Sequence, residues 1–216
     1  METKYKIKGL FAKIRDDLQT EITPCLNRGN RGGYFSVTLI VFSLIEYLGT
    51  LYKNPIEKDE KNKRRTYYTK TQIQKTAIPY IQKYLGRVRQ EYKIYSGLLY
   101  ALYRHSLVHY FHPTEILFDN KKITWKVIKG SKKDHLLCTK QKTNYSKVKF
   151  TEQITLAINI DILIQDLFSS LDEFEKDALK FKKISTNIIR ADKKLNNPRP
   201  AFSFTQKYII HDLENL

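Results

Sequence analysis

The sequence contains little cysteine, no long uncharged apolar run, and few acidic residues relative to basic ones. Cys25 and Cys138 are its two cysteines, and they form no CxxC pair. Two cysteines are too few for a disulfide scaffold, so a reducing compartment is expected. The apolar run from Phe35 to Leu51 carries Glu46 and several hydroxyl side chains, which predicts a buried core helix rather than a membrane span.

Several motifs that define enzyme classes are also missing. The first ten residues, METKYKIKGL, are charged and have no apolar segment of the kind found in a secretory signal. The sequence has no G-x-S-x-G, no paired-carboxylate motif and no catalytic Cys-His signature. We therefore expect a soluble, cytoplasmic protein with no membrane partner, no metal and no cofactor.

The composition is that of a folded chain with a strong positive charge. Of the 216 residues 41% are hydrophobic, and 39 Lys and Arg against 22 Asp and Glu leave a net charge of +17. Residues 51–95 carry a net +8 and residues 121–149 a net +9, so the rest of the chain is neutral. Two basic blocks on a neutral scaffold indicate a partner rich in phosphate, with RNA first, although a lysine-rich surface from an AT-biased genome would produce the same count.

Side chains in the first basic block are the candidate nucleic-acid contacts. The block interleaves basic residues with tyrosines such as Tyr80, Tyr84 and Tyr92, which could stack on bases unless they belong to the core. The candidate binding residues are Lys61, Lys63, Arg64, Arg65, Arg87 and Arg89.

Hydrophobic periodicity predicts one mainly α domain covering residues 1–216. Helices are expected over about 3–20 (ended by Pro24), 36–52, 70–85 (kinked at Pro79) and 90–110, followed by a long last helix over 159–190. A small antiparallel β insertion is expected at about 114–158, with a hairpin of 116–118 and 123–128 around Asp119-Asn120 and further strands near 135–138, 148–150 and 154–158. Trp125 lies in this insertion and is expected to pack. The acidic residues of the last helix are predicted to form its solvated face: Asp166, Asp172, Glu173, Glu175 and Asp177.

The end of the fourth predicted helix concentrates residues suited to phosphodiester chemistry. His105, His109 and His112, three of the five histidines, fall within eight residues beside Arg104. Histidine can accept and donate a proton near neutral pH, and arginine binds a phosphate through a permanent charge.

The string Arg104-His105-Ser106-Leu107-Val108-His109 resembles the R-x4–6-H motif of the HEPN superfamily, in which a polar residue often follows the arginine. The segment 32–52, with Glu46 and Leu48-Gly49, is similar to an early helix of bacterial HEPN-like proteins. The resemblance implies a HEPN-like helical bundle and a metal-independent endoribonuclease. In such an enzyme the 2′-hydroxyl of the RNA attacks the adjacent phosphate and leaves a 2′,3′-cyclic phosphate. It further implies that His109 is the acid and base, that Arg104 stabilises the phosphorane, and that His105 orients its neighbours or binds phosphate.

The geometry of a regular helix favours a composite site in a homodimer. Residues five apart point about 140° from one another, so Arg104 and His109 converge on one helix only if its end unwinds. Three alternatives remain open: a core role for His109, a metal site at His105, His109 and His112, and a non-catalytic module that binds RNA or nucleotides. Such a module could pair with an antitoxin protein, as in toxin–antitoxin and defence systems.

Overall fold

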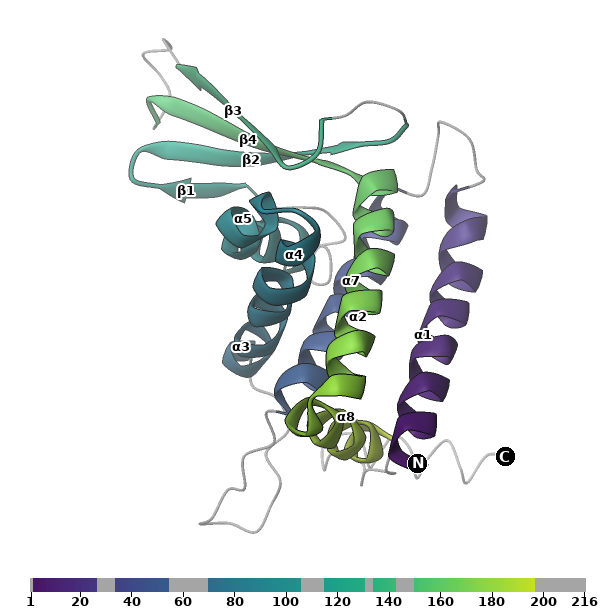
Figure 1. Ribbon diagram of the computed structural model, residues 1–216. Coiled ribbons are helices and arrows are strands. Elements are labelled where there is room, and N and C mark those ends of the chain that lie inside the picture. Colours follow the sequence, from purple (N-terminus) through teal and green to yellow (C-terminus); the bar gives the residue numbers. More distant parts are fainter. Residues whose placement is uncertain are drawn as a thin grey trace, which may run out of the picture.

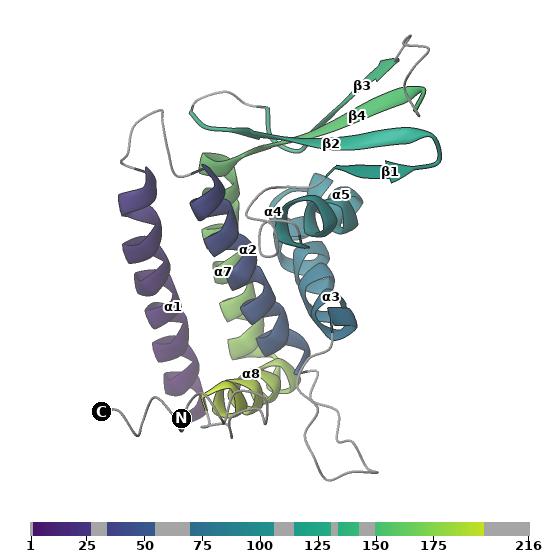
Figure 2. The same ribbon diagram turned by 180° about the vertical axis from the view of Figure 1, so that it is seen from behind.

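The computed structural model describes residues 2–26, 34–54, 70–105, 115–130, 134–142 and 150–196, with only the backbone described for 70–74 and 105. Most of these residues are helical, and a four-stranded sheet precedes the last two helices. The sheet covers one end of the helical bundle, and α8 (Lys182–Leu195) crosses the opposite end (Figures 1 and 2). The prediction of a mainly α fold with a β insertion is therefore confirmed at this level.

Three long helices stand side by side beneath the sheet: α1 (Glu2–Leu26), α2 (Tyr34–Lys53) and α7 (Ile160–Lys180) (Figure 1). The stripe of α1 that begins at Ile7 and Phe11 is buried, as its helical spacing predicts. The prediction that Pro24 ends this helix was wrong, because α1 continues to Leu26. A proline so near the end removes a single hydrogen bond of the last turn, and buried Ile22 holds that turn against the core.

The predicted long last helix is two helices. Phe181 has φ −107° and ψ 113°, which is extended backbone, and it separates α7 from α8. Apolar residues keep their helical spacing across this break, and neither glycine nor proline lies there, so the sequence carries no local signal for it. Asn159 caps the start of α7 by accepting hydrogen bonds from the backbone N–H groups of Asp161 and Ile162.

A second stack of helices packs on the other side of α2 and α7. It consists of α3 (Lys70–Tyr80), the π-helix η2 (Ile81–Leu85), α4 (Gly86–Val88), α5 (Glu91–Leu99) and the π-helix η3 (Tyr100–His105). The predicted irregularity at Pro79 is present, since α geometry ends one residue later. Gly49 allows α2 to lie close to α3, because a Cβ there would stand 2.5 Å from the backbone oxygen of Thr76.

The sheet has the order β1-β2-β4-β3 and is mixed rather than antiparallel. The strands are β1 (Ile116–Phe118), β2 (Lys121–Ile128), β3 (Leu137–Lys142) and β4 (Glu152–Asn159). The predicted β1–β2 hairpin is confirmed, with Asp119 and Asn120 both at positive φ, as a two-residue hairpin turn requires. The prediction of a wholly antiparallel insertion was wrong, since β4 lies between β2 and β3 and pairs in parallel with β2. Residues 143–149, which include part of the strand expected at 148–150, lie outside the described ranges.

The core of the bundle is rich in aromatic rings. Phe174 of α7 lies with its ring centroid 4.6 Å from that of Tyr84 and 5.5 Å from that of Tyr80. Tyr80, Tyr84 and Tyr92 are fully buried, so base stacking by these three tyrosines is excluded. Trp125 packs as expected, with its ring edge-to-face on Phe35 at 5.7 Å.

By length and composition, α2 is the one helix among the described residues that could cross a membrane. Its mean hydropathy over the relevant window is 1.6, and half of that window is buried. A core helix of a soluble protein meets the same criteria. In this fold α2 packs against α3 and α8, and the buried face of α2 includes Val41 and Leu48.

Candidate functional site

Arg104 lies where η3 meets α2, and its guanidinium is bound to a carboxylate. The Nη2 atom of Arg104 donates to Oε2 of Glu46 at 2.5 Å, and the hydroxyl of Tyr100 donates to Oε1 at 2.9 Å. The Arg104 and Glu46 side chains are only 15% and 13% exposed. Burial and the neighbouring Glu46 carboxylate raise the pKa of Tyr100 above its usual value. We refer to Glu46, Tyr100 and Arg104 as the motif network.

The residue just before the motif, Tyr103, joins the bundle to the sheet. The hydroxyl of Tyr103 donates to the backbone oxygens of Lys126 in β2, at 3.2 Å, and Leu156 in β4, at 2.7 Å. Residues 100–105 follow π geometry, so the angle between side chains on a regular α-helix does not apply to them. π-Helical turns are frequent at functional sites.

The other expected catalytic residues are placed only in part. His105 is the last residue of η3, and its side chain is not described. His109 and His112 lie outside the described residues, as do Lys61, Lys63, Arg64 and Arg65. The convergence of Arg104 with His109 therefore stays a prediction.

Arg87 and Arg89 are described, and both are engaged with acidic side chains of α7. Nη2 of Arg87 lies 3.1 Å from Asp177, and Nε of Arg89 lies 3.0 Å from Asp166. The hydrogen bond to Asp166 raises the pKa of Arg89 further. The two arginine side chains are 39% and 37% exposed, so each has an outer surface that remains accessible to a ligand.

The prediction of a solvated acidic face on the last helix was wrong for Asp166 and Asp177, which are buried, whereas Asp172 is exposed as predicted. The carboxylates of α7 also bind cations from other segments of the chain. Besides the Arg87 and Arg89 pairs, Arg15 of α1 donates to both Asp172 and Glu175 at 2.7 Å. The acids of α7 therefore hold the bundle together.

A buried polar cluster that sequence reasoning missed surrounds His135. Nε2 of His135 lies 2.8 Å from the hydroxyl of Tyr92, which donates to Asp166 at 3.1 Å. Nδ1 of the same ring accepts from the backbone N–H of Asn159 at 3.0 Å. We refer to Arg89, Tyr92, His135, Asn159 and Asp166 as the junction network. A lone histidine between two lysine-rich stretches carries no periodic signal that would have identified it.

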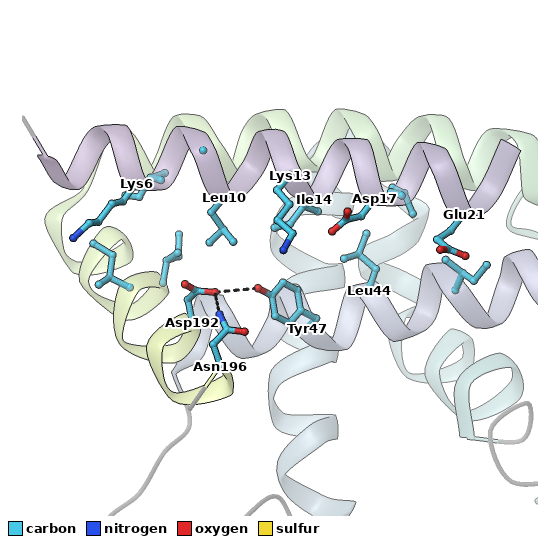
Figure 3. Close-up of a pocket in the computed structure, with 16 residues that line it drawn as sticks. Lys6, Leu10, Lys13, Ile14, Asp17, Glu21, Leu44, Tyr47, Asp192 and Asn196 are labelled. Carbon is cyan, nitrogen blue, oxygen red and sulfur yellow. Dashed lines mark hydrogen bonds between the residues drawn. The ribbon is translucent and has the colours of Figure 1, made fainter. Parts of the chain in front are cut away.

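A groove of about 640 Å³ lies on a different face of α2, between α1 and α8 (Figure 3). Its apolar walls include Leu10, Ile14 and Leu44, and Tyr47 and Asp192 are hydrogen-bonded at 3.4 Å inside it. The pKa of Tyr47 is raised to about 12, mainly by burial and to a smaller extent by the charge of Asp192. Neither Glu46 nor Arg104 lines this groove, so it is separate from the motif network.

Within the described ranges, no group of three or more His, Cys, Asp or Glu side chains is placed to hold a metal ion. The alternative metal site at His105, His109 and His112 is not tested by this finding, because His109 and His112 lie outside the described residues. No protein-family model matches the sequence, and no curated protein or solved structure matches it either.

Proposed function

We propose that this protein is a HEPN-like, metal-independent endoribonuclease. The observation that carries the proposal is the environment of Arg104, the arginine of the R-x4-H string, at the end of a late helix in a mainly helical bundle. Glu46 of α2 binds this side chain and is itself held by the hydroxyl of Tyr100, and Tyr103 fixes the turn that carries it. Preorganised charge of this kind stabilises charge that develops in a transition state.

The guanidinium retains capacity to bind a phosphate. It has five N–H donors, and the bond to Glu46 is made through Nη2. Within the described residues, Nε of Arg104 is buried and has no hydrogen-bond partner. An unpaired buried donor is unfavourable, and a phosphate oxygen that reached Nε through movement of the residues covering it would relieve that cost.

The proposed chemistry needs no metal. The 2′-hydroxyl of the substrate loses its proton to a base and attacks the adjacent phosphorus, and the bond from phosphorus to the 5′-oxygen breaks while that oxygen takes a proton from an acid. The products are a 2′,3′-cyclic phosphate and a 5′-hydroxyl end. We assign proton transfer to His109, charge stabilisation of the phosphorane to Arg104, and phosphate binding or orientation to His105.

The proposal includes a two-fold homodimer in the cytoplasm with the segments 104–109 of two chains facing each other. Light scattering at micromolar concentration should give twice the mass of the 25.6 kDa chain. A monomer, or a dimer with these segments on its outer faces, contradicts the composite site. A toxin–antitoxin or defence role, with an antitoxin protein as partner, is the biological setting that the resemblance implies.

Incubation of total RNA with the full chain in EDTA tests the activity. Cleavage that leaves 2′,3′-cyclic phosphate ends supports the proposal. Binding without cleavage favours a non-catalytic RNA-binding module, and activity that returns only with zinc favours the metal site. His211→Ala is the matched control for His109→Ala, because it removes a histidine outside the motif and should leave cleavage intact.

A further inference from the structure

His135 joins the sheet to the helical bundle at one buried point. Its side chain is 1% exposed and lies two residues before the start of β3. It contacts Tyr92 of α5, and it accepts a hydrogen bond from the backbone of Asn159, where β4 becomes α7. Asn159 in turn donates from its side chain to the oxygen of Gly130, beyond the end of β2. Three strands therefore meet two helices here.

The hydrogen bonds define the protonation state of the ring. Nδ1 accepts from the N–H of Asn159, so it carries no proton. The hydroxyl of Tyr92 donates its proton to Asp166, so its oxygen accepts from Nε2–H. The imidazole is therefore neutral, with its proton on Nε2, and both ring nitrogens are satisfied only in that state.

The charged groups around the ring oppose one another. Asp166 of α7 lies 3.7 Å from Nε2 and favours a protonated ring, as does Glu91 of α5 more weakly, whereas Arg89 disfavours it. Burial is the largest influence, and the pKa of His135 falls to about 4.

The backbone beside His135 is strained. Leu136 has φ 55°, in the left-handed region that a leucine rarely adopts, and its side chain is 3% exposed. Such a conformation persists only where the surrounding contacts enforce it. Leu136 is held in this conformation by the hydrogen bonds of His135, which precedes it, and by the pairing of β3, which begins at the next residue.

We propose that His135 is a pH-operated latch, which holds the sheet on the helical bundle when neutral and releases it when protonated under mildly acidic conditions. A proton on Nδ1 would face the N–H of Asn159, so the bond to β4 is lost and the strained turn at Leu136 is freed. Because Tyr103 binds the backbones of both β2 and β4, release of the sheet also loosens the turn that carries Arg104. The latch does not depend on the proposed ribonuclease activity.

Hydrogen exchange at the amides of Ala157 and Ile158 in β4, expressed as protection factors, tests the latch. In the opened state the histidine regains its ordinary pKa of about 6.5, so acidification favours opening until the folded-state value is reached. Between pH 7 and pH 5 the protection factors should fall about 20-fold. Protection that is unchanged over this range overturns the proposal.

Two variants distinguish the effect of His135 protonation on hydrogen exchange from the effect of carboxylates, which titrate at lower pH. His135→Asn keeps an oxygen near the position of Nδ1 to accept from Asn159 but cannot be protonated, so its protection should not vary between pH 7 and pH 5. His211→Asn is the control and should keep the fall. If His135→Asn shows the same fall as the parent chain, the latch is refuted.

The parent protein supplies an independent check should His135→Asn fail to fold. Nitrogen NMR of the His135 ring should show the Nε2–H tautomer at pH 7 and a titration midpoint below about pH 5. An Nδ1–H tautomer, or a midpoint at or above the ordinary value, also overturns the proposal.

Discussion

The motif network and the junction network are built from the same three kinds of side chain. In each, a carboxylate from a long helix accepts a hydrogen bond from a tyrosine hydroxyl and from an arginine: Glu46 with Tyr100 and Arg104, Asp166 with Tyr92 and Arg89. They differ in the solvent exposure of the arginine and in their additional members. Arg104 is 15% exposed and begins the R-x4-H string, whereas Arg89 is 37% exposed and its network includes a neutral histidine.

The comparison shows that an arginine–carboxylate pair does not by itself identify a functional site. Arg89 can turn toward solvent if its partner is lost, but Arg104 has little room to do so. The neighbouring residues distinguish the two networks. The motif histidines come after Arg104 in the sequence. Asp166 is instead linked by hydrogen bonds, through the hydroxyl of Tyr92, to His135, which joins the sheet to the bundle.

Removal of the carboxylate from each network should give the largest difference in unfolding free energy between the two networks. Glu46→Ala leaves a nearly buried charge on Arg104 without its partner, so unfolding free energy should fall by about 3 kcal/mol. Asp166→Ala should lower it by about 2 kcal/mol, since Arg89 can reach water while Tyr92 keeps its bond to His135. Denaturant titration measures both values.

A double variant sharpens that result. Glu46→Leu combined with Arg104→Met removes both charges and should be more stable than Glu46→Leu alone by about 1–3 kcal/mol. Equal losses for Glu46→Ala and Asp166→Ala, or no recovery in the double variant, would show that the burial of Arg104 is not what distinguishes the motif network.

Gly49 tests whether the close approach of α2 to α3 helps to set the position of Glu46, one turn earlier. Gly49→Ala forces a Cβ to within 2.5 Å of a backbone oxygen, so it should lower the unfolding free energy by about 1–3 kcal/mol. Gly97→Ala in α5 is the matched control. Apart from its chain neighbours and the nearby backbone of its own helix, no described atom lies within 4 Å of a Cβ there, and this change should stabilise the protein by about 0.5–1 kcal/mol. A stabilising Gly49→Ala contradicts the close approach.

The smallest effect concerns RNA binding by the two paired arginines. Reversal of charge at Lys61, Lys63, Arg64 and Arg65 should flatten the slope of log affinity against log salt by up to about 3, since each lost phosphate contact on a single strand contributes about 0.7. Arg87→Gln and Arg89→Gln should together change it by less than about 1, because α7 carboxylates already hold both side chains. An affinity that does not depend on salt contradicts polyanion binding altogether.

Features that depend on local spacing could be predicted from the sequence. Helical periodicity located α1, α2 and α7, and the Asp119-Asn120 turn located the β1–β2 hairpin. The parallel pairing of β2 with β4 and the break at Phe181 could not be predicted, because both depend on contacts between distant segments. The same holds for the partners of Arg104. In the sequence, Glu46 argued against a membrane span and contributed to the family resemblance, but nothing indicated that it meets Arg104 across 58 positions of the chain.

The most direct test of the proposed activity compares RNA cleavage by the parent protein and by His109→Ala under single-turnover conditions in EDTA. If His109 transfers the proton, the cleavage rate should fall by about 10²–10⁴-fold while RNA affinity and thermal stability stay at parental values. A variant that cleaves at the parental rate, or one that loses activity only because it unfolds, contradicts the assignment of His109 and with it the proposal that this protein is a HEPN-like ribonuclease.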